Sequence, residues 1–161
     1  MKNKFENVTG AGCVIYFDNT KNIIKNKPNK ILYLVLINNN DKYDFPKGAS
    51  DPFENELVCA IRETKEETNL EVNKNYIIDT NKSEIFSEGL VMFLANYILD
   101  FKDLNKEPDL GKNIKIIPTK VTDDYSVLEH KGFFWDSYDN IKHNFPLYLQ
   151  EVLYWAKINI E

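Results

Sequence analysis

The stretch Gly48–Leu70, "GASDPFENELVCAIRETKEETNL", combines a turn with a helix and gathers several carboxylates close together. Apolar residues recur every three or four positions between 53 and 68, which predicts one buried face of a helix over these residues. Asp51 or Ser50 is the predicted N-cap, and Asn69 suits the left-handed backbone that ends a helix. We expect the apolar face of this helix to pack on a sheet.

Strands are predicted on both sides of this helix, and a second helix is predicted near the end of the chain. Runs rich in branched and aromatic residues predict strands at 12–17, 30–38, 90–101, 113–121 and 131–138. Residues 145–158 repeat with a helical period, and Pro146 suits a first turn. This order is typical of an α+β or layered α/β/α protein, and 161 residues suit one domain over 1–161.

The composition indicates a folded protein with a modest negative charge. Hydrophobic residues make up 43% of the chain and aromatic residues 13%, which is enough to build a core. The net charge of −5 argues against a broad nucleic-acid groove but permits a phosphate site that contains a metal. Cys13 and Cys59 are expected to pack in the core. Without a signal peptide or spanning segment, a cytoplasmic protein with no membrane contact is expected.

Glu63, Glu66 and Glu67 project to one side of the predicted helix, within an arc of roughly 100°. Such like-charge pairs repel, each costing about 0.2–0.5 kcal/mol. An ordinary solvated acidic face would relieve this repulsion with lysines, but Lys65 is the only lysine in the cluster and points elsewhere. A hard divalent cation turns the repulsion into attraction, because it takes carboxylate oxygens together with substrate phosphates. The cluster therefore predicts a site for Mg²⁺, with Mn²⁺ as the alternative ion.

The spacing G-x5-E-x7-R-E-x-x-E-E-x-x-L over residues 48–70 resembles the Nudix box, G-x5-E-x7-R-E-U-x-E-E-x-G-U, in which U is a bulky aliphatic residue. Thr64 and Asn69 depart from the pattern at the first U and at the second glycine, and neither position is a metal ligand in the family. The resemblance implies the Nudix fold, an α/β/α sandwich with a mixed central sheet. The matching residues are Gly48, Glu54, Arg62, Glu63, Glu66, Glu67 and Leu70.

The resemblance also implies roles for the matching residues. The three glutamates of the helix would bind Mg²⁺ or Mn²⁺, and the carbonyl of Gly48 would add an oxygen ligand. Arg62 would orient the carboxylates through charge-assisted hydrogen bonds, with Glu54 as its supporting partner. The metal would neutralise a diphosphate and activate water for attack on phosphorus. The implied enzyme is a pyrophosphohydrolase that acts on a nucleoside diphosphate joined to another group.

Two segments outside the box bear on the substrate. "DFPKG" (44–48) and "EHKGFFW" (129–135) resemble segments of diadenosine tetraphosphate hydrolases. Lys47 in the first segment can reach a substrate phosphate as a point charge. In the second, Glu129 is a candidate metal ligand or base, and His130 is a candidate phosphate contact. The favoured substrate is therefore a dinucleoside polyphosphate such as diadenosine tetraphosphate.

Several alternatives stay open from the sequence. "GFFWDSY" (132–138) also resembles RNA 5′-pyrophosphohydrolases, so hydrolysis of an RNA 5′ end or mRNA decapping is the alternative activity. A Nudix module that binds a nucleotide without hydrolysing it is a further alternative, which the intact glutamates disfavour. Aromatic residues near the expected cleft are candidates for stacking on a base, namely Tyr43, Phe45 and Phe133.

Overall fold

A computed structural model describes residues 8–72, 76–98, 110–111, 114–116, 119–122 and 125–161. Its strands are β1 (Gly10–Asp18), β2 (Ile31–Asn38), β3 (Tyr43–Asp44), β4 (Lys47–Ala49), β5 (Tyr76–Ile85), β6 (Leu90–Tyr97), β7 (Thr119–Thr122), β8 (Tyr125–Val127) and β9 (His130–Ser137). Its helices are α1 (Glu56–Thr68), α3 (Tyr138–Ile141) and α4 (Leu147–Ile160), with a 3₁₀ turn at Ser87–Gly89. Within these ranges, no helix has both the length and the apolar character needed to cross a membrane.

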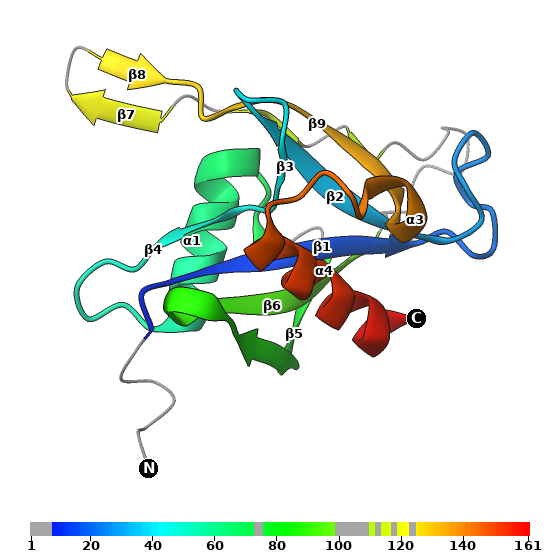
Figure 1. Cartoon of the computed structure of the whole chain (residues 1–161), viewed down its shortest axis with the longest axis horizontal. Coiled ribbons are helices and arrows are strands. Elements are labelled where there is room, and N and C mark those ends of the chain that lie inside the picture. Colours follow the sequence, from blue (N-terminus) through cyan, green and yellow to red (C-terminus); the bar gives the residue numbers. More distant parts are fainter. Residues whose placement is uncertain (1–7, 73–75, 99–109, 112–113, 117–118, 123–124) are drawn as a thin grey trace.

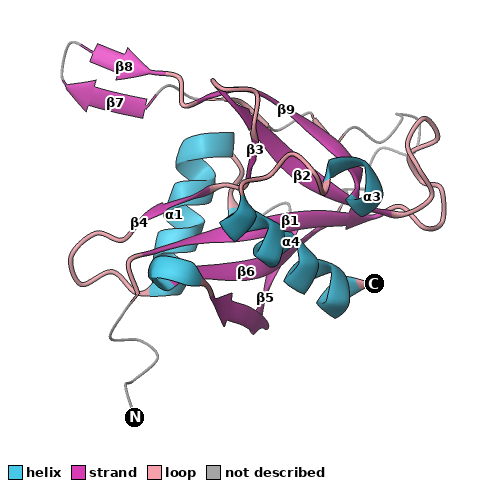
Figure 2. Ribbon diagram, viewed as in Figure 1, coloured by secondary structure: helices cyan, strands magenta, loops and turns pink. Residues whose placement is uncertain are grey.

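The main sheet is mixed and has seven strands, with the central order β3-β2-β1-β6-β5 (Figure 2). Strand β1 runs parallel to β6 and antiparallel to β2, so both kinds of pairing meet at the centre of the sheet. Strand β4 pairs with the start of β1, and β9 pairs with β2. Strands β7 and β8 form a separate hairpin that projects away from the sheet (Figure 1).

The two faces of the sheet are covered by different helices. Neighbouring residues of a strand point to opposite faces, so Cys13 packs toward α1 whereas Val14 packs toward α4. On the first face the core includes Ala60 of α1, and on the second it includes Leu149 of α4. Figure 1 shows α1 and α4 on opposite sides of the sheet. The predicted α/β/α sandwich with a mixed central sheet is confirmed.

Most predicted elements are found, with shifted ends. Strands β1, β2, β6 and β9 and helix α4 match predictions from the sequence, although the end of the predicted strand 90–101 lies outside the described residues. The predicted strand at 113–121 is wrong at 114–116, which lie in no strand, and β7 begins only at Thr119. Strand β5 was not predicted, because its register shifts between Asp79 and Ser83 and the shift interrupts any alternation of apolar residues.

Helix α1 begins later than predicted, and its N-cap is Asn55. The Asn55 side chain accepts a hydrogen bond from the backbone N–H of Val58 at 2.8 Å. The prediction of Asp51 or Ser50 as the cap is wrong, because Asp51 instead opens a turn whose carbonyl accepts the Glu54 N–H at 3.1 Å. The predicted end is confirmed, since Asn69 has the left-handed φ of 67°.

Phe53 in this turn has a left-handed backbone at φ 64°, although its side chain is fully exposed at 109%. A residue with a Cβ atom loses about 1–2 kcal/mol in this conformation. We therefore expect Phe53→Gly to raise the free energy of unfolding by about 1 kcal/mol, as measured by urea denaturation. Phe53→Ala also removes the ring but keeps the Cβ, so it should show no gain. An equal gain in both variants would contradict the backbone explanation.

Candidate active site

Arg62 forms hydrogen bonds with one carboxylate that precedes α1 and with two carboxylates of α1 itself. Its Nε and Nη2 atoms donate to the two carboxylate oxygens of Glu54 at 2.8 and 2.9 Å. Its Nη1 donates to Glu63 at 2.9 Å and to Glu66 at 3.1 Å. The paired hydrogen bonds from Arg62 lower the pKa of Glu54 to about 2. One guanidinium thus fixes the positions of three carboxylates.

Arg62 is the only arginine in a sequence that otherwise uses lysine. A lysine ammonium carries the same charge but lacks the planar fork that binds two groups of acceptors at once. Besides the carboxylates, Nη2 of Arg62 donates to the carbonyl of Ala49 at 2.9 Å. The contacts expected between Arg62 and the box glutamates are therefore present, and they require a guanidinium.

The carboxylate of Glu63 lies directly against the backbone of Gly48. A Cβ atom added at Gly48 would stand 2.2 Å from both Cδ and Oε2 of Glu63, so no other residue fits without displacing the carboxylate. Burial raises the pKa of Glu63, and the neighbouring Glu66 carboxylate raises it further. The carbonyl of Gly48 accepts a hydrogen bond from the Cys59 thiol at 3.6 Å. Its role as a metal ligand stays a prediction.

Glu67 is buried, with 8% of its surface exposed, and its carboxylate accepts the backbone N–H of Lys47 at 3.2 Å. Burial raises the pKa of Glu67 to about 9, and the nearby carboxylate of Asp44 adds to the increase. Glu66 differs, because 56% of its side chain is exposed. A buried carboxylate such as Glu67 gains more from a bound cation than an exposed one does, since water screens it less.

The raised pKa of Glu67 predicts that the metal-free protein becomes less stable as the pH rises. Glu67 titrates near 9 in the folded state and near 4.5 in the unfolded state, so the folded state binds more protons between these values. The free energy of unfolding therefore keeps its full value, as far as Glu67 is concerned, below the pKa of the unfolded state. It falls as the pH rises toward the pKa of the folded state. In the wild type, the free energy of unfolding should fall by up to about 1.4 kcal/mol per pH unit because of Glu67, and we expect Glu67→Gln to remove this decrease.

Urea denaturation with a chelator at several pH values between about 5 and 8 measures this slope. Glu56→Gln, in the first turn of the same helix, is the matched control and should keep the wild-type slope. Equal slopes in the two variants would show that Glu67 is not the group that titrates.

Asp44 lies at the centre of a second group of charges. Its carboxylate accepts a hydrogen bond from Nε2 of His130 at 2.8 Å and another from Nζ of Lys47 at 2.9 Å. Burial alone would raise the pKa of Asp44, but His130 and Lys47 lower it by more. Burial alone would lower the pKa of Lys47, and Asp44 raises it above its usual value. Asp44 was not predicted from the sequence, although its spacing of three from Lys47 was a usable signal.

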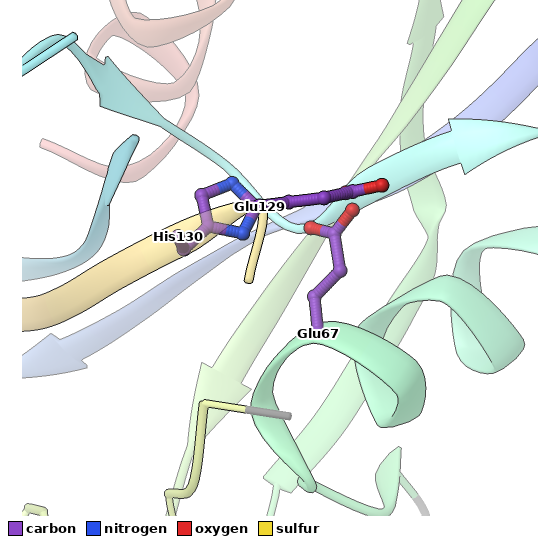
Figure 3. A group of neighbouring side chains, drawn as sticks. All are labelled: Glu67, Glu129 and His130. Carbon is purple, nitrogen blue, oxygen red and sulfur yellow. The ribbon is translucent and has the colours of Figure 1, made fainter. Parts of the chain in front are cut away.

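Glu129 and His130 lie beside Glu67, as Figure 3 shows. One possible ligand atom from each of the three side chains lies within 4.8 Å of the other two. His130 is buried, with 3% of its surface exposed, whereas Glu129 is exposed. The pairing of β9 with β2 brings His130 opposite Asn38 and so carries this segment to the end of α1. The structure thus brings the two motifs together, and the roles of these residues stay predictions.

The three aromatic residues predicted to stack on a base differ in how deeply they are buried. The prediction for Phe45 is wrong, because its side chain is fully buried and stacks on Phe145 with 4.6 Å between the ring centroids. Tyr43 is half-buried and makes an edge contact with Phe134 at 5.1 Å. Phe133 is half-buried and packs against the core on the α1 face. Tyr43 and Phe133 keep some exposed surface, and base stacking by either of them stays a prediction.

A cavity of about 520 Å³ opens beside β4 and shares Lys47 and Gly48 with the group of carboxylates. Its volume lies in the range of about 300–1,000 Å³ typical of small-molecule sites. Tyr148 of α4 lines it, and Nζ of Lys47 stands 5.9 Å from the centre of the Tyr148 ring. Tyr148 was not predicted, because helical periodicity does not reveal which exposed residues of a helix face a cavity.

Several solved structures share this fold. An Ap4A hydrolase of C. elegans in a binary complex is 22% identical, with 94% of this chain and 97% of that chain covered and a TM-score of 0.64. A second structure of C. elegans Ap4A hydrolase is 24% identical, with 96% and 99% covered and a TM-score of 0.60. The NUDIX domain of Shewanella oneidensis NrtR, complexed with ADP ribose, is 11% identical, with 100% and 91% covered and a TM-score of 0.57.

At these identities the solved structures establish the fold alone, and no curated protein matches the chain in sequence. The sequence pattern described as the NUDIX domain matches residues 9–113, which is well over half of the chain and includes the whole box. The match covers β1, α1 and β6, whose packing forms the centre of the fold. The chain belongs to the Nudix family of pyrophosphohydrolases.

Proposed function

We propose that the chain hydrolyses dinucleoside polyphosphates, with diadenosine tetraphosphate as the favoured substrate. The observation that supports this proposal best is the position of Glu129 and His130 beside Glu67. The segment that resembles diadenosine tetraphosphate hydrolases is thereby folded against the carboxylates of the box. Two solved structures of C. elegans Ap4A hydrolase, which match 94% and 96% of the chain, agree with this choice in fold.

The proposed cofactor is Mg²⁺, with Mn²⁺ as the alternative, and the residues fit such an ion. Glu63 is held against Gly48 and Glu67 is buried near Asp44, so both carboxylates carry pKa values raised by burial. Oxygen ligands of this kind are those that hard divalent cations take in proteins. When bound, the ion supplies positive charge for the diphosphate and lowers the pKa of water. Arg62 would hold Glu63 and Glu66 in position throughout.

The remaining residues suggest where the rest of the substrate lies. Lys47 lines the cavity and its backbone N–H contacts Glu67, so it lies between the cavity and the carboxylates. Its ammonium can therefore contact a phosphate of a substrate that extends from the cavity to the carboxylates. The base would enter the cavity and stack on Tyr148, a residue that is 40% exposed. Glu129, which is exposed beside Glu67, would either bind the ion or take the proton of the attacking water.

A side-by-side assay tests the activity. Diadenosine tetraphosphate, nucleoside triphosphates, capped RNA and 5′-triphosphate RNA are each supplied with Mg²⁺ or Mn²⁺, and kcat/KM is compared. We expect the highest value for diadenosine tetraphosphate, with release of mononucleotide products. A higher value for either RNA would favour the RNA 5′-end activity. Turnover of none of them would favour a module that binds nucleotides without hydrolysis.

Tyr148→Ala tests the place of the base. We expect KM for diadenosine tetraphosphate to rise about tenfold with little change in kcat, because stacking on one ring contributes about 1–3 kcal/mol to binding. Steady-state kinetics separate the two constants. Tyr154→Ala is the matched control, because Tyr154 lies on the same helix, is 57% exposed and does not line this cavity. Equal KM values in the two variants would remove Tyr148 from the substrate site.

A further inference from the structure

We propose that His130 is a metal ligand and, with Glu67 and Glu129, forms a site that prefers Mn²⁺ to Mg²⁺. Asp44 is the residue that orients His130 for this role. The inference rests on the proposed function, because it assigns a nitrogen ligand to the metal centre which that function requires. It also replaces the predicted phosphate contact of His130.

The geometry brings three different segments to one point. Glu67 comes from the last turn of α1, Glu129 from the residue before β9, and His130 from the first residue of β9. Their possible ligand atoms all lie within 4.8 Å of one another, a spacing that one ion can bridge. Figure 3 shows the edge of the His130 ring and the carboxylate of Glu67 facing each other.

Asp44 determines which nitrogen of His130 is free to bind. The Nε2 atom of His130 lies 2.8 Å from the Asp44 carboxylate, so this nitrogen carries the proton and donates it. Across the part of the chain that the structure describes, the second ring nitrogen has no hydrogen-bond partner. This nitrogen is therefore the one available to bind an ion beside Glu67 and Glu129. A carboxylate that bonds one histidine nitrogen while the other binds a metal is a common arrangement.

The balance of charges also leaves room for a cation at this point. Lys47 pairs with Asp44, and Arg62 pairs with the glutamates nearer the start of α1. Among the described residues, neither Glu67 nor Glu129 has a lysine or arginine within ion-pair distance. Glu67, Glu129 and His130 thus meet at a point where the Lys47 ammonium acts on Glu67 only from a distance, because that ammonium is paired with Asp44.

The nitrogen ligand decides which ion is preferred. Mg²⁺ takes oxygen ligands in near-octahedral geometry and keeps several waters. Imidazole suits transition metals, and affinity for such sites rises from Mn²⁺ along the first-row series. The carboxylates beside Arg62 provide oxygen alone, so they do not discriminate in this way. His130 would therefore give the enzyme a preference for Mn²⁺ that the box by itself lacks.

Electron spin echo spectroscopy of bound Mn²⁺, without substrate, tests the inference. We expect modulation from ¹⁴N in the wild-type protein, and its replacement by ¹⁵N modulation when only the histidines are labelled. The chain has two histidines, and His143 is exposed, so His143→Asn is the matched control. His143→Asn should keep the signal. His130→Asn should lose it and bind Mn²⁺ about 10–100-fold more weakly, with Mg²⁺ affinity much less affected.

The labelled wild-type protein decides the question even if His130→Asn fails to fold. Unchanged modulation after labelling, or loss of the signal in His143→Asn, would overturn the inference. Asp44→Asn should weaken Mn²⁺ binding about tenfold while the far-ultraviolet circular dichroism stays that of the wild type.

The outcomes for the two proposals can be separated. Hydrolysis of diadenosine tetraphosphate with Mg²⁺ but no histidine modulation would leave the proposed function standing and refute the histidine ligand. Histidine modulation without turnover of any nucleotide would refute the proposed function and support the metal site.

Discussion

Glu67→Gln is expected to lower kcat for diadenosine tetraphosphate about 10²–10³-fold at saturating Mg²⁺, since loss of one group that stabilises charge costs this much. The amide has the shape of the carboxylate but cannot neutralise a cation. Glu67 is buried and accepts the N–H of Lys47, and the amide oxygen can keep that hydrogen bond. The fold should therefore survive while the activity is lost. Steady-state kinetics with a Mg²⁺ titration measures the effect.

Glu56→Gln provides the control for this change. Glu56 lies in the first turn of α1 and, among the described residues, is not one of the carboxylates that Arg62 or Lys47 contacts, so the same substitution should leave kcat within about twofold of the wild type. Normal turnover in the Glu67→Gln protein would remove Glu67 from the metal site. The binding of Mn²⁺ to each variant shows whether the loss begins with the ion.

Gly48→Ala is expected to lower kcat/KM about 100-fold, because a displacement of about 1 Å at a catalytic group has this effect. The added methyl would stand 2.2 Å from the carboxyl carbon of Glu63, so the carboxylate must move. Its hydrogen bond to Arg62 at 2.9 Å would be strained at the same time. Because the added methyl meets only the end of the Glu63 side chain, the free energy of unfolding should fall by at most about 1 kcal/mol. Kinetics and urea denaturation measure the two effects separately.

The chain offers a matched glycine for comparison. A Cβ atom added at Gly132 in β9 would meet nothing within 4 Å, so Gly132→Ala should keep both activity and stability. If Gly48→Ala were as active as Gly132→Ala, the contact between Gly48 and Glu63 would have no catalytic importance. Thermal melts identify any loss of activity that comes from unfolding alone.

Local spacing explains why so much was predictable from the sequence. The helical period of α1 is a property of neighbouring residues, and it placed Glu63 and Glu67 near each other before any tertiary contact was known. The left-handed end at Asn69 follows from the backbone preference of a single residue and is confirmed at φ 67°. The layered fold follows from the order of strands and helices.

Long-range packing explains what was missed. The contact between Asp44 and His130 joins residues 86 positions apart, and no local pattern contains it. Tyr148 lines the cavity only because α4 crosses the sheet beside β4. Phe45 was a candidate for stacking on a base, but it is buried and stacks on Phe145, which lies 100 positions later in the chain. The cap of α1 was misplaced because the turn at Phe53 depends on a backbone conformation that phenylalanine rarely adopts.

The pairing of β3 and β9 with the same strand has a consequence for folding. Asp44 pairs with Leu36 of β2, and His130 pairs with Asn38 of the same strand, so their contact exists only after β2 has both neighbours. Closing so long a loop carries an entropy cost that must be met before the contact forms, which delays such pairings in folding. The ion proposed to bind Glu67, Glu129 and His130 would therefore bind only once β3 and β9 are both paired with β2, and it would stabilise the protein mainly by slowing the rate of unfolding.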